Sequence, residues 1–268
     1  MSDCASLRQP PELTADVFKA MIEKSSLRTG QIVALGVLAG MYIGFGGLFA
    51  TVALAGADAV LPHGVAQVLA GLVFATGLVL VVIAGAELFT GNLLMAGPVA
   101  AKSLPLSQAT VALLVVYLAN FAGSVLLAVL VFAAGMHLSE GGAIAAAAMD
   151  IASTKASLGF TAAVASGVLA NILVCLAVWL SYSATSTTDK VAAVLLPIAA
   201  FVAAGLEHSV ANMYLLSYAW MIQDASADAA AISLARILGN IVPATIGNII
   251  GGSSVALAYW WSYHREAE

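Results

Sequence analysis

The stretch GLEHSVANM at residues 205–213 decides the fold, because it places a carboxylate and an imidazole inside a long and otherwise uncharged segment. The chain has 268 residues, of which 62% are hydrophobic and 9% are charged, and its mean hydropathy is +1.03. Soluble proteins carry about a quarter charged residues. We therefore interpret the chain as an integral membrane protein, in which Glu207 and His208 are costly to place within the bilayer and are expected to have a role.

Six apolar blocks follow one another along the chain, each long enough to cross a bilayer at about 20 residues per crossing. The blocks cover residues 30–56, 64–100, 106–135, 156–183, 190–222 and 230–263. They predict one all-α membrane domain over residues 30–263, followed by a short tail over residues 264–268. Residues 1–29 show apolar residues at helical spacing after two prolines, which is typical of an amphipathic helix at the membrane surface.

The few cations predict the orientation, because Lys and Arg accumulate in cytoplasmic loops. If the N-terminus lies inside, seven of the nine cations fall on the cytoplasmic side, and only Lys155 and Arg236 fall on the other side. We therefore expect the N- and C-termini, including the tail over residues 264–268, to be cytoplasmic.

Two of the blocks are too long for a single crossing. At 1.5 Å per residue, block 64–100 would extend roughly 55 Å and block 190–222 roughly 50 Å, whereas the hydrocarbon layer is about 30 Å thick. Block 64–100 contains GAELFTGN at residues 85–92, whose glycine, glutamate and asparagine each lie 120 positions before those of the opening stretch. We predict that the second and fifth helices are interrupted at these two stretches.

Further matches between the two halves of the chain indicate an internal repeat. GVLAG at residues 36–40 resembles GVLAN at residues 167–171, and Asn120-x-x-Gly123 resembles Asn248-x-x-Gly251. Because each half has three crossings, the second half would enter the membrane in the opposite direction. The sequence thus predicts six transmembrane helices in an inverted 3+3 repeat, an arrangement typical of transport proteins whose sites lie at interrupted helices.

The interruptions predict a passage, because broken helices in a membrane are buried in protein or line a wet cavity. His208 has no counterpart in the first half, where Leu88 stands, and its imidazole could exchange a proton with a weak acid or donate a hydrogen bond to an anion. Thr90, on the opposite break, is the expected hydroxyl partner of His208. We expect Glu207 to cap exposed amides or to hold a neighbouring side chain, and Lys155 could draw anions into a vestibule or face lipid headgroups.

Bulky apolar residues flank both breaks and could form constrictions that resist bare charge, although the spacing fits core packing equally well. These residues are Phe74, Leu78 and Phe201. The two cysteines lie in unrelated settings and indicate neither a disulfide nor a metal site, so we expect no cofactor. No basic run suggests nucleic acid. Ser209 and His208 are sequence neighbours, which do not face one another on a helix, and this argues against a hydrolytic enzyme.

Four segments of the chain match the signature of one family of membrane proteins. They are GAELFTGN at 85–92, GVLANILVCLAVWLSYS at 167–183, GLEHSVANM at 205–213 and PATIGNIIGG at 243–252. These segments resemble those of the formate/nitrite transporter family, and its formate channels most closely, from about residue 15 to 263. The resemblance implies an aquaporin-like fold with interrupted second and fifth helices, assembled as a homopentamer with one pore per subunit. We expect such a protein in the cytoplasmic (inner) membrane of a bacterium.

The resemblance also implies roles for individual residues. The family's pore histidine falls on His208 with its threonine partner on Thr90, its vestibule lysine falls on Lys155, and its pore asparagine falls on Asn171. Its constrictions correspond to Phe74, Leu78, Leu88, Phe89 and Phe201. The chain departs from the formate channels at Glu87 and Gly91, where aspartate and serine are more usual, and this could alter gating.

The expected function is a passive or proton-coupled channel for a small monovalent anion of a weak acid, with formate as the first candidate. Nitrite and hydrosulfide, carried by other branches of the family, are alternatives. In a second mechanism the anion stays charged and His208 serves only as a hydrogen-bond donor. A water or neutral-solute channel is a further alternative, but Asn92 and Asn212 are followed by Leu93 and Met213, where an aquaporin would carry Pro-Ala.

Overall fold

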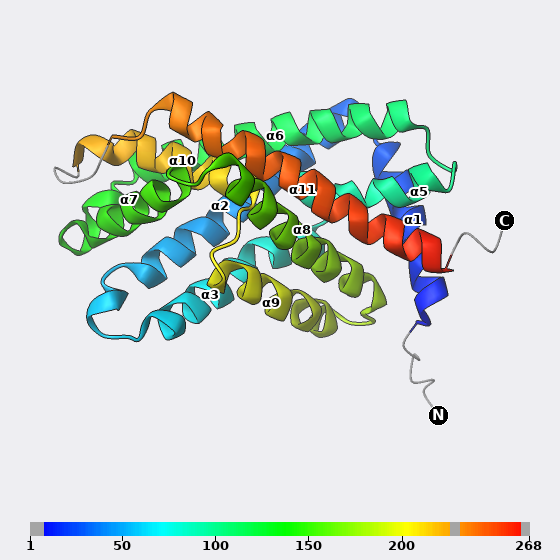
Figure 1. The fold of residues 1–268 in the computed structure, drawn as a ribbon, viewed down its shortest axis with the longest axis horizontal. Coiled ribbons are helices and arrows are strands. Elements are labelled where there is room, and N and C mark those ends of the chain that lie inside the picture. Colours follow the sequence, from blue (N-terminus) through cyan, green and yellow to red (C-terminus); the bar gives the residue numbers. More distant parts are fainter. Residues whose placement is uncertain (1–7, 226–230, 264–268) are drawn as a thin grey trace.

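The computed structural model describes residues 8–225 and 231–263, and in this part of the chain the regular structure is entirely helical (Figure 1). The predicted tail over residues 264–268 lies outside the described residues. The α-helices are α1 (Pro10–Ser25), α2 (Thr29–Leu54), α3 (His63–Ala84), α4 (Phe89–Asn92), α5 (Ala96–Ala100), α6 (Leu106–Ala133), α7 (Ala143–Ala156), α8 (Phe160–Ser183), α9 (Thr187–Ala203), α10 (Ser209–Ile222) and α11 (Leu234–Tyr263). Short 3-10 turns are η1 (Ala57–Ala59), η2 (Leu93–Met95), η3 (Met136–Gly142) and η4 (Gln223–Ala225).

Five helical segments among the described residues are long and apolar enough to cross a membrane. They are Thr29–Ala59, His63–Ala84, Leu106–Ala133, Phe160–Ser183 and Leu234–Tyr263. Their outer faces expose large apolar side chains, such as Val111, Leu114 and Leu118 on α6. Exposed apolar surface of this extent suits contact with lipid rather than water.

Helix α1 packs against the other helices through one apolar face. Two prolines begin the helix, a position that tolerates proline because the first N–H groups have no partner within the helix. Leu13, Val17 and Met21 recur on the buried face, and α1 contacts α5, α8 and α11. A helix is therefore present where the N-terminal segment predicts one, and its apolar face is covered by protein.

The two long apolar blocks do not form single helices in the described chain. Helix α3 ends at Ala84 and α4 begins at Phe89, while α9 ends at Ala203 and α10 begins at Ser209. Helices α3 and α9 pack against each other, as do α2 with α6 and α8 with α11 (Figure 1).

Glycines allow close approach within each of these helix pairs. A Cβ atom on Gly123 of α6 would collide with the carbonyl oxygen of Val37 on α2, and a Cβ on Gly251 of α11 would collide with that of Val168 on α8. Small residues at such positions let membrane helices approach closely. The two tight pairs hold the scaffold around the non-helical segments that follow α3 and α9.

Candidate functional site

Both non-helical segments begin with a glycine in the left-handed conformation. Gly85 has φ of 74° and Gly205 has φ of 67°, a region that glycine enters without the steric cost borne by other residues. The next residue closes the helix end in each case, because Ala86 N–H donates to the Val81 carbonyl at 2.9 Å and Leu206 N–H donates to that of Phe201 at 3.1 Å. Both segments therefore leave their helices through the same turn.

Asn248 on α11 holds the segment after α9 through three hydrogen bonds. Its Oδ1 accepts from Ser209 N–H at 2.8 Å, and its Nδ2 donates to the carbonyl oxygens of Gly167 at 2.8 Å and Glu207 at 2.9 Å. Asn248 is fully buried. Its amide thus satisfies two groups that the missing helix turn leaves without partners, the Ser209 N–H and the Glu207 carbonyl, and ties the segment to α8 through the Gly167 carbonyl.

Asn120 on α6 does the same for the segment after α3. Its Oδ1 accepts from Phe89 N–H at 2.9 Å, and its Nδ2 donates to the carbonyl oxygens of Gly36 and Glu87, each at 2.8 Å. The two asparagines thus make matching sets of contacts at equivalent places.

Glu207 is a buried carboxylate with three side-chain donors. Its side chain is 1% exposed and accepts from Lys155 Nζ at 2.9 Å, from Asn212 Nδ2 at 2.6 Å and from Asn240 Nδ2 at 2.8 Å. A buried charge requires a partner and hydrogen bonds to offset desolvation. Lys155, in the last turn of α7, is thus anchored beside the non-helical segment rather than turned outward to headgroups.

Glu87 has a similar environment at the other segment. Lys24 Nζ of α1 and Asn92 Nδ2 each donate to the Glu87 carboxylate at 2.6 Å. The Lys24 side chain is 23% exposed and the Glu87 side chain 3% exposed. Helix α1 is therefore tied to this segment by charge as well as by apolar packing.

His208 and Thr90 meet between the two segments. His208 is the N-cap of α10, and its Nδ1 accepts from Ala211 N–H at 3.1 Å. Its Nε2 lies 2.8 Å from Thr90 Oγ1. In a neutral imidazole one nitrogen accepts and the other carries the proton, so acceptance at Nδ1 places the proton on Nε2. The ring then donates to the Thr90 oxygen, which leaves the Thr90 O–H free to donate to another group.

Asn171 fixes the backbone beneath this contact. Its Nδ2 donates to the carbonyl oxygens of Thr90 at 3.2 Å and Asn248 at 2.8 Å. Cys175 Sγ also donates to the Thr90 carbonyl at 3.3 Å. The structure thus places the predicted site residue Asn171 behind the Thr90 and His208 pair, where it positions Thr90.

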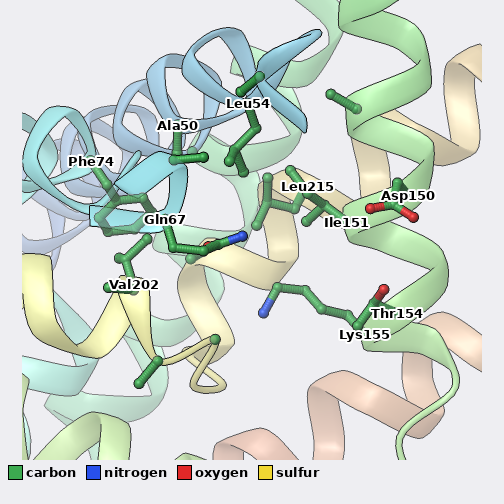
Figure 2. A pocket seen from close by; sticks show the side chains of 18 of the residues that line it. Ala50, Leu54, Gln67, Phe74, Asp150, Ile151, Thr154, Lys155, Val202 and Leu215 are labelled. Atoms are coloured by element: carbon green, nitrogen blue, oxygen red, sulfur yellow. The ribbon is translucent and has the colours of Figure 1, made fainter. Parts of the chain in front are cut away.

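A cavity of about 840 Å³ is lined by residues from the loop after α2 to His208. Helices α3 and α7 form facing walls, from which Gln67 and Lys155 point into the same space (Figure 2). Phe74 and Phe201 also line it, with ring centroids 5.5 Å apart in an edge-to-face arrangement. The Phe201 ring centroid lies 5.9 Å from that of His208, so the aromatic pair borders the approach to the imidazole.

The other predicted constriction residues lie in different places. Leu78 and Leu88 are buried at 1% and 2% exposure. The Phe89 ring packs edge-on against Tyr117 at 4.8 Å between centroids. Phe89 lines a second, mainly apolar groove of about 710 Å³ between α6 and α11. The main cavity is thus lined by five predicted site residues, namely Phe74, Phe201, Lys155, Glu207 and His208. Phe89 lines the second groove instead.

Sequence reasoning missed several side chains that build the site. The sequence indicates Lys24 only as one of the cytoplasmic cations. Asn240 belongs to no recognised motif, yet its side-chain amide bridges the Lys155 carbonyl and the Glu207 carboxylate. Gln67 was also not identified as a site residue, although the sequence indicates it as an isolated amide within the apolar block 64–100. Among the described residues, no group of three or more His, Cys, Asp or Glu side chains has the arrangement of a metal site.

Comparisons with known proteins show which family the chain is similar to. The sequence model described as "Formate/nitrite transporter" matches residues 11–261. The formate channel FocA of Escherichia coli (strain K12) is 36% identical over 94% of this chain and 91% of its own. A solved structure described as "Pentameric formate channel with formate bound" has a TM-score of 0.80 and 36% identity, covering 87% of this chain and 96% of that one. A structure described as "FNT family ion channel" has a TM-score of 0.82 and 29% identity, with 94% and 98% covered.

Proposed function

Because the chain belongs to the formate/nitrite transporter family, we propose that it conducts a small monovalent anion of a weak acid, with formate as the expected substrate. It is an integral membrane protein, and the relatives named above are channels rather than enzymes. The formate named for those relatives supports this choice of substrate.

The observation that carries the proposal is the hydrogen bond between Thr90 and His208 at the inner end of the cavity. A bare anion loses its hydration when it passes the Phe74 and Phe201 rings, and an apolar constriction provides no hydrogen bonds to replace the lost water. The Thr90 hydroxyl is buried against His208, which lines the cavity with those rings, and it has a free proton because it accepts from His208. That hydroxyl can donate to an anion oxygen as soon as the hydration shell is lost.

The same pair supports proton sharing. If the anion takes the Thr90 proton, the Thr90 oxygen takes the proton on His208 Nε2, and Nδ1 must then gain a proton from cavity water. The net change is one anion plus one proton giving one neutral acid. Since Nδ1 accepts from Ala211 N–H, this replacement requires that hydrogen bond to open. Donation without transfer, in which the anion stays charged, is the alternative mechanism.

We further propose six crossings in an inverted 3+3 repeat. Helices α2, α3 with α4–α5, and α6 would form one half, and α8, α9 with α10, and α11 the other, within a channel domain over residues 30–263. The matching contacts of Asn120 and Asn248 support this pairing, as do the matching Lys24–Glu87 and Lys155–Glu207 ion pairs. Residues 1–29 and the tail would lie at the cytoplasmic surface of a bacterial inner membrane.

The assembly that we propose is a homopentamer with one conduit per subunit. It is supported by the description of the similar solved structure as pentameric. The detergent-solubilised protein should then have about five times the protomer mass of 27.1 kDa. Light scattering after size-exclusion chromatography, corrected for bound detergent, measures this directly, and a monomeric mass would contradict the proposal.

Formate flux into proteoliposomes tests the function. The wild type should carry formate with proton entry, and His208→Asn should lower that coupled uptake by about tenfold or more, because the asparagine amide cannot take up and release a proton and its shorter side chain weakens the contact with Thr90. Asparagine is a strong N-cap residue, so α10 keeps its cap in this variant. Unchanged coupled uptake would reject proton sharing at His208.

Two further measurements separate the alternatives. Competition of nitrite and hydrosulfide against formate ranks the anions. Osmotic swelling without formate detects a water or neutral-solute channel, and swelling in the absence of any formate flux by the wild type would reject the proposed function.

A further inference from the structure

The cavity above His208 carries more negative than positive formal charge. Asp58, Asp150 and Glu207 line it together with one cation, Lys155, which gives −2 with the histidines neutral. The Lys155 charge is already paired with Glu207 at 2.9 Å. A monovalent anion is therefore not drawn inward by the net charge of these walls, and local hydrogen-bond donors must hold it.

Gln67 supplies such a donor. It extends from α3 into the cavity, where it is partly exposed (Figure 2). No residue in the described ranges 8–225 and 231–263 forms a hydrogen bond with its amide. An isolated amide on a membrane helix costs free energy unless water or a ligand satisfies it. Its two N–H groups are available to whatever occupies the cavity.

The position of Gln67 suits a holding site before the aromatic constriction. Phe74 lies seven residues further along α3, which is about two helical turns or roughly 10 Å, and both residues line the cavity. Lys155 reaches toward the same space from α7 on the facing wall (Figure 2). An anion between them would meet donors from two sides before it loses its water at Phe74.

We propose that Gln67 and Lys155 form a subsite that holds a small carboxylate at the base of the vestibule, with the amide donating to one oxygen and the ammonium group to the other. The subsite rests on the proposed conduction of a weak-acid anion. An amide has an acceptor as well as donors, whereas an ammonium group only donates. Gln67 therefore also accepts the O–H of the protonated acid, so the pair receives the substrate in both protonation states.

The test is the dependence of initial formate uptake on formate concentration in proteoliposomes at neutral pH. Gln67→Leu keeps the approximate size and removes both hydrogen-bonding groups. It should raise the half-saturating formate concentration about fivefold, the effect of one net hydrogen bond, and leave the maximal rate unchanged. Gln67→Glu has the same shape and adds a negative charge, so it should raise the half-saturating concentration further. Gln67→Asn, with its amide drawn back by one methylene, should fall between the wild type and Gln67→Leu.

The matched control is Val68→Leu on the next position of α3, where the side chain faces outward and is 49% exposed. It should keep the wild-type concentration dependence. If Gln67→Leu keeps the wild-type value while Gln67→Glu raises it, only charge matters at this position and the subsite is rejected. If the wild type carries no formate, the proposed function fails. Formate uptake by the wild type with unaltered half-saturation in all three Gln67 variants rejects the subsite alone.

Discussion

Replacing Asn248 by leucine should destabilise the folded protein by at least about 2 kcal/mol. The residue is fully buried, and its amide satisfies one backbone N–H and two carbonyl groups around the segment after α9. Leucine has a similar size and no polar atom, so the Ser209 N–H and the Glu207 carbonyl lose a partner. The bond to the Gly167 carbonyl is lost as well, but Gly167 lies within α8 and its carbonyl remains part of that helix. Each unsatisfied buried group costs about 1–3 kcal/mol, and no solvent reaches this position to replace the bonds.

Asn120→Leu should cost a similar amount, because Asn120 makes the same three kinds of contact at the segment after α3. The equal loss of stability at the two positions is the more specific part of the prediction, because the two asparagines lie 128 residues apart in the sequence. Ser254→Ala is the matched control on α11. It removes a single local bond to the Gly251 carbonyl and should change stability by less than about 0.5 kcal/mol.

The measurement is equilibrium unfolding in mixed micelles titrated with SDS, with all variants at one protein concentration because the stability of an oligomer depends on it. Formate uptake of the same preparations should fall in both asparagine variants. A loss below about 1 kcal/mol would refute the reasoning. So would a large loss at one asparagine and none at the other.

Two further substitutions test the ion pair and the hydroxyl. Lys155→Met should lower the free energy of unfolding by about 3–5 kcal/mol in the same assay, because it leaves the buried Glu207 carboxylate without its cation. Adding Glu207→Gln should recover most of that loss. A double variant that is no more stable than Lys155→Met alone would contradict this prediction. Thr90→Val keeps the side-chain shape and removes the proton offered to the anion, so formate uptake should fall about tenfold with little loss of stability, and normal uptake would show that the hydroxyl is not used.

Much of the scaffold could be predicted from the sequence because the repeat is visible in residue types. Glutamate and asparagine recur 120 positions apart, and each glutamate accepts from the asparagine five residues later at 2.6 Å. The lysines could not be paired in this way. Lys24 precedes Glu87 by 63 positions and Lys155 precedes Glu207 by 52 positions. Both lie in the last turn of a helix, α1 or α7, and the stretches between these helices and the glutamates differ in length.

The directions in which individual side chains point at the start of α4 could not be predicted from the sequence. The resemblance assigns Phe89 to a constriction and Thr90 to the pore, but successive residues on an α-helix point about 100° apart. Thr90 faces His208, so the ring of Phe89 turns away and packs against Tyr117. Only the helix start, fixed by the bond from Phe89 N–H to Asn120, determines which of the two neighbours faces the imidazole.

The two halves of the chain share the contacts that hold the backbone and differ in the residue that, in the proposed function, would meet the anion. A segment without helical hydrogen bonds has the same unsatisfied backbone groups whichever way it enters the bilayer, so an asparagine and a buried acid with its lysine serve both segments. In the proposed function an anion would pass the middle of the conduit once. One imidazole is enough there, and Leu88 stands where a second histidine would otherwise place a second costly polar group. In the proposed function the duplication would therefore supply the frame, and its departure from symmetry at His208 would supply the chemistry.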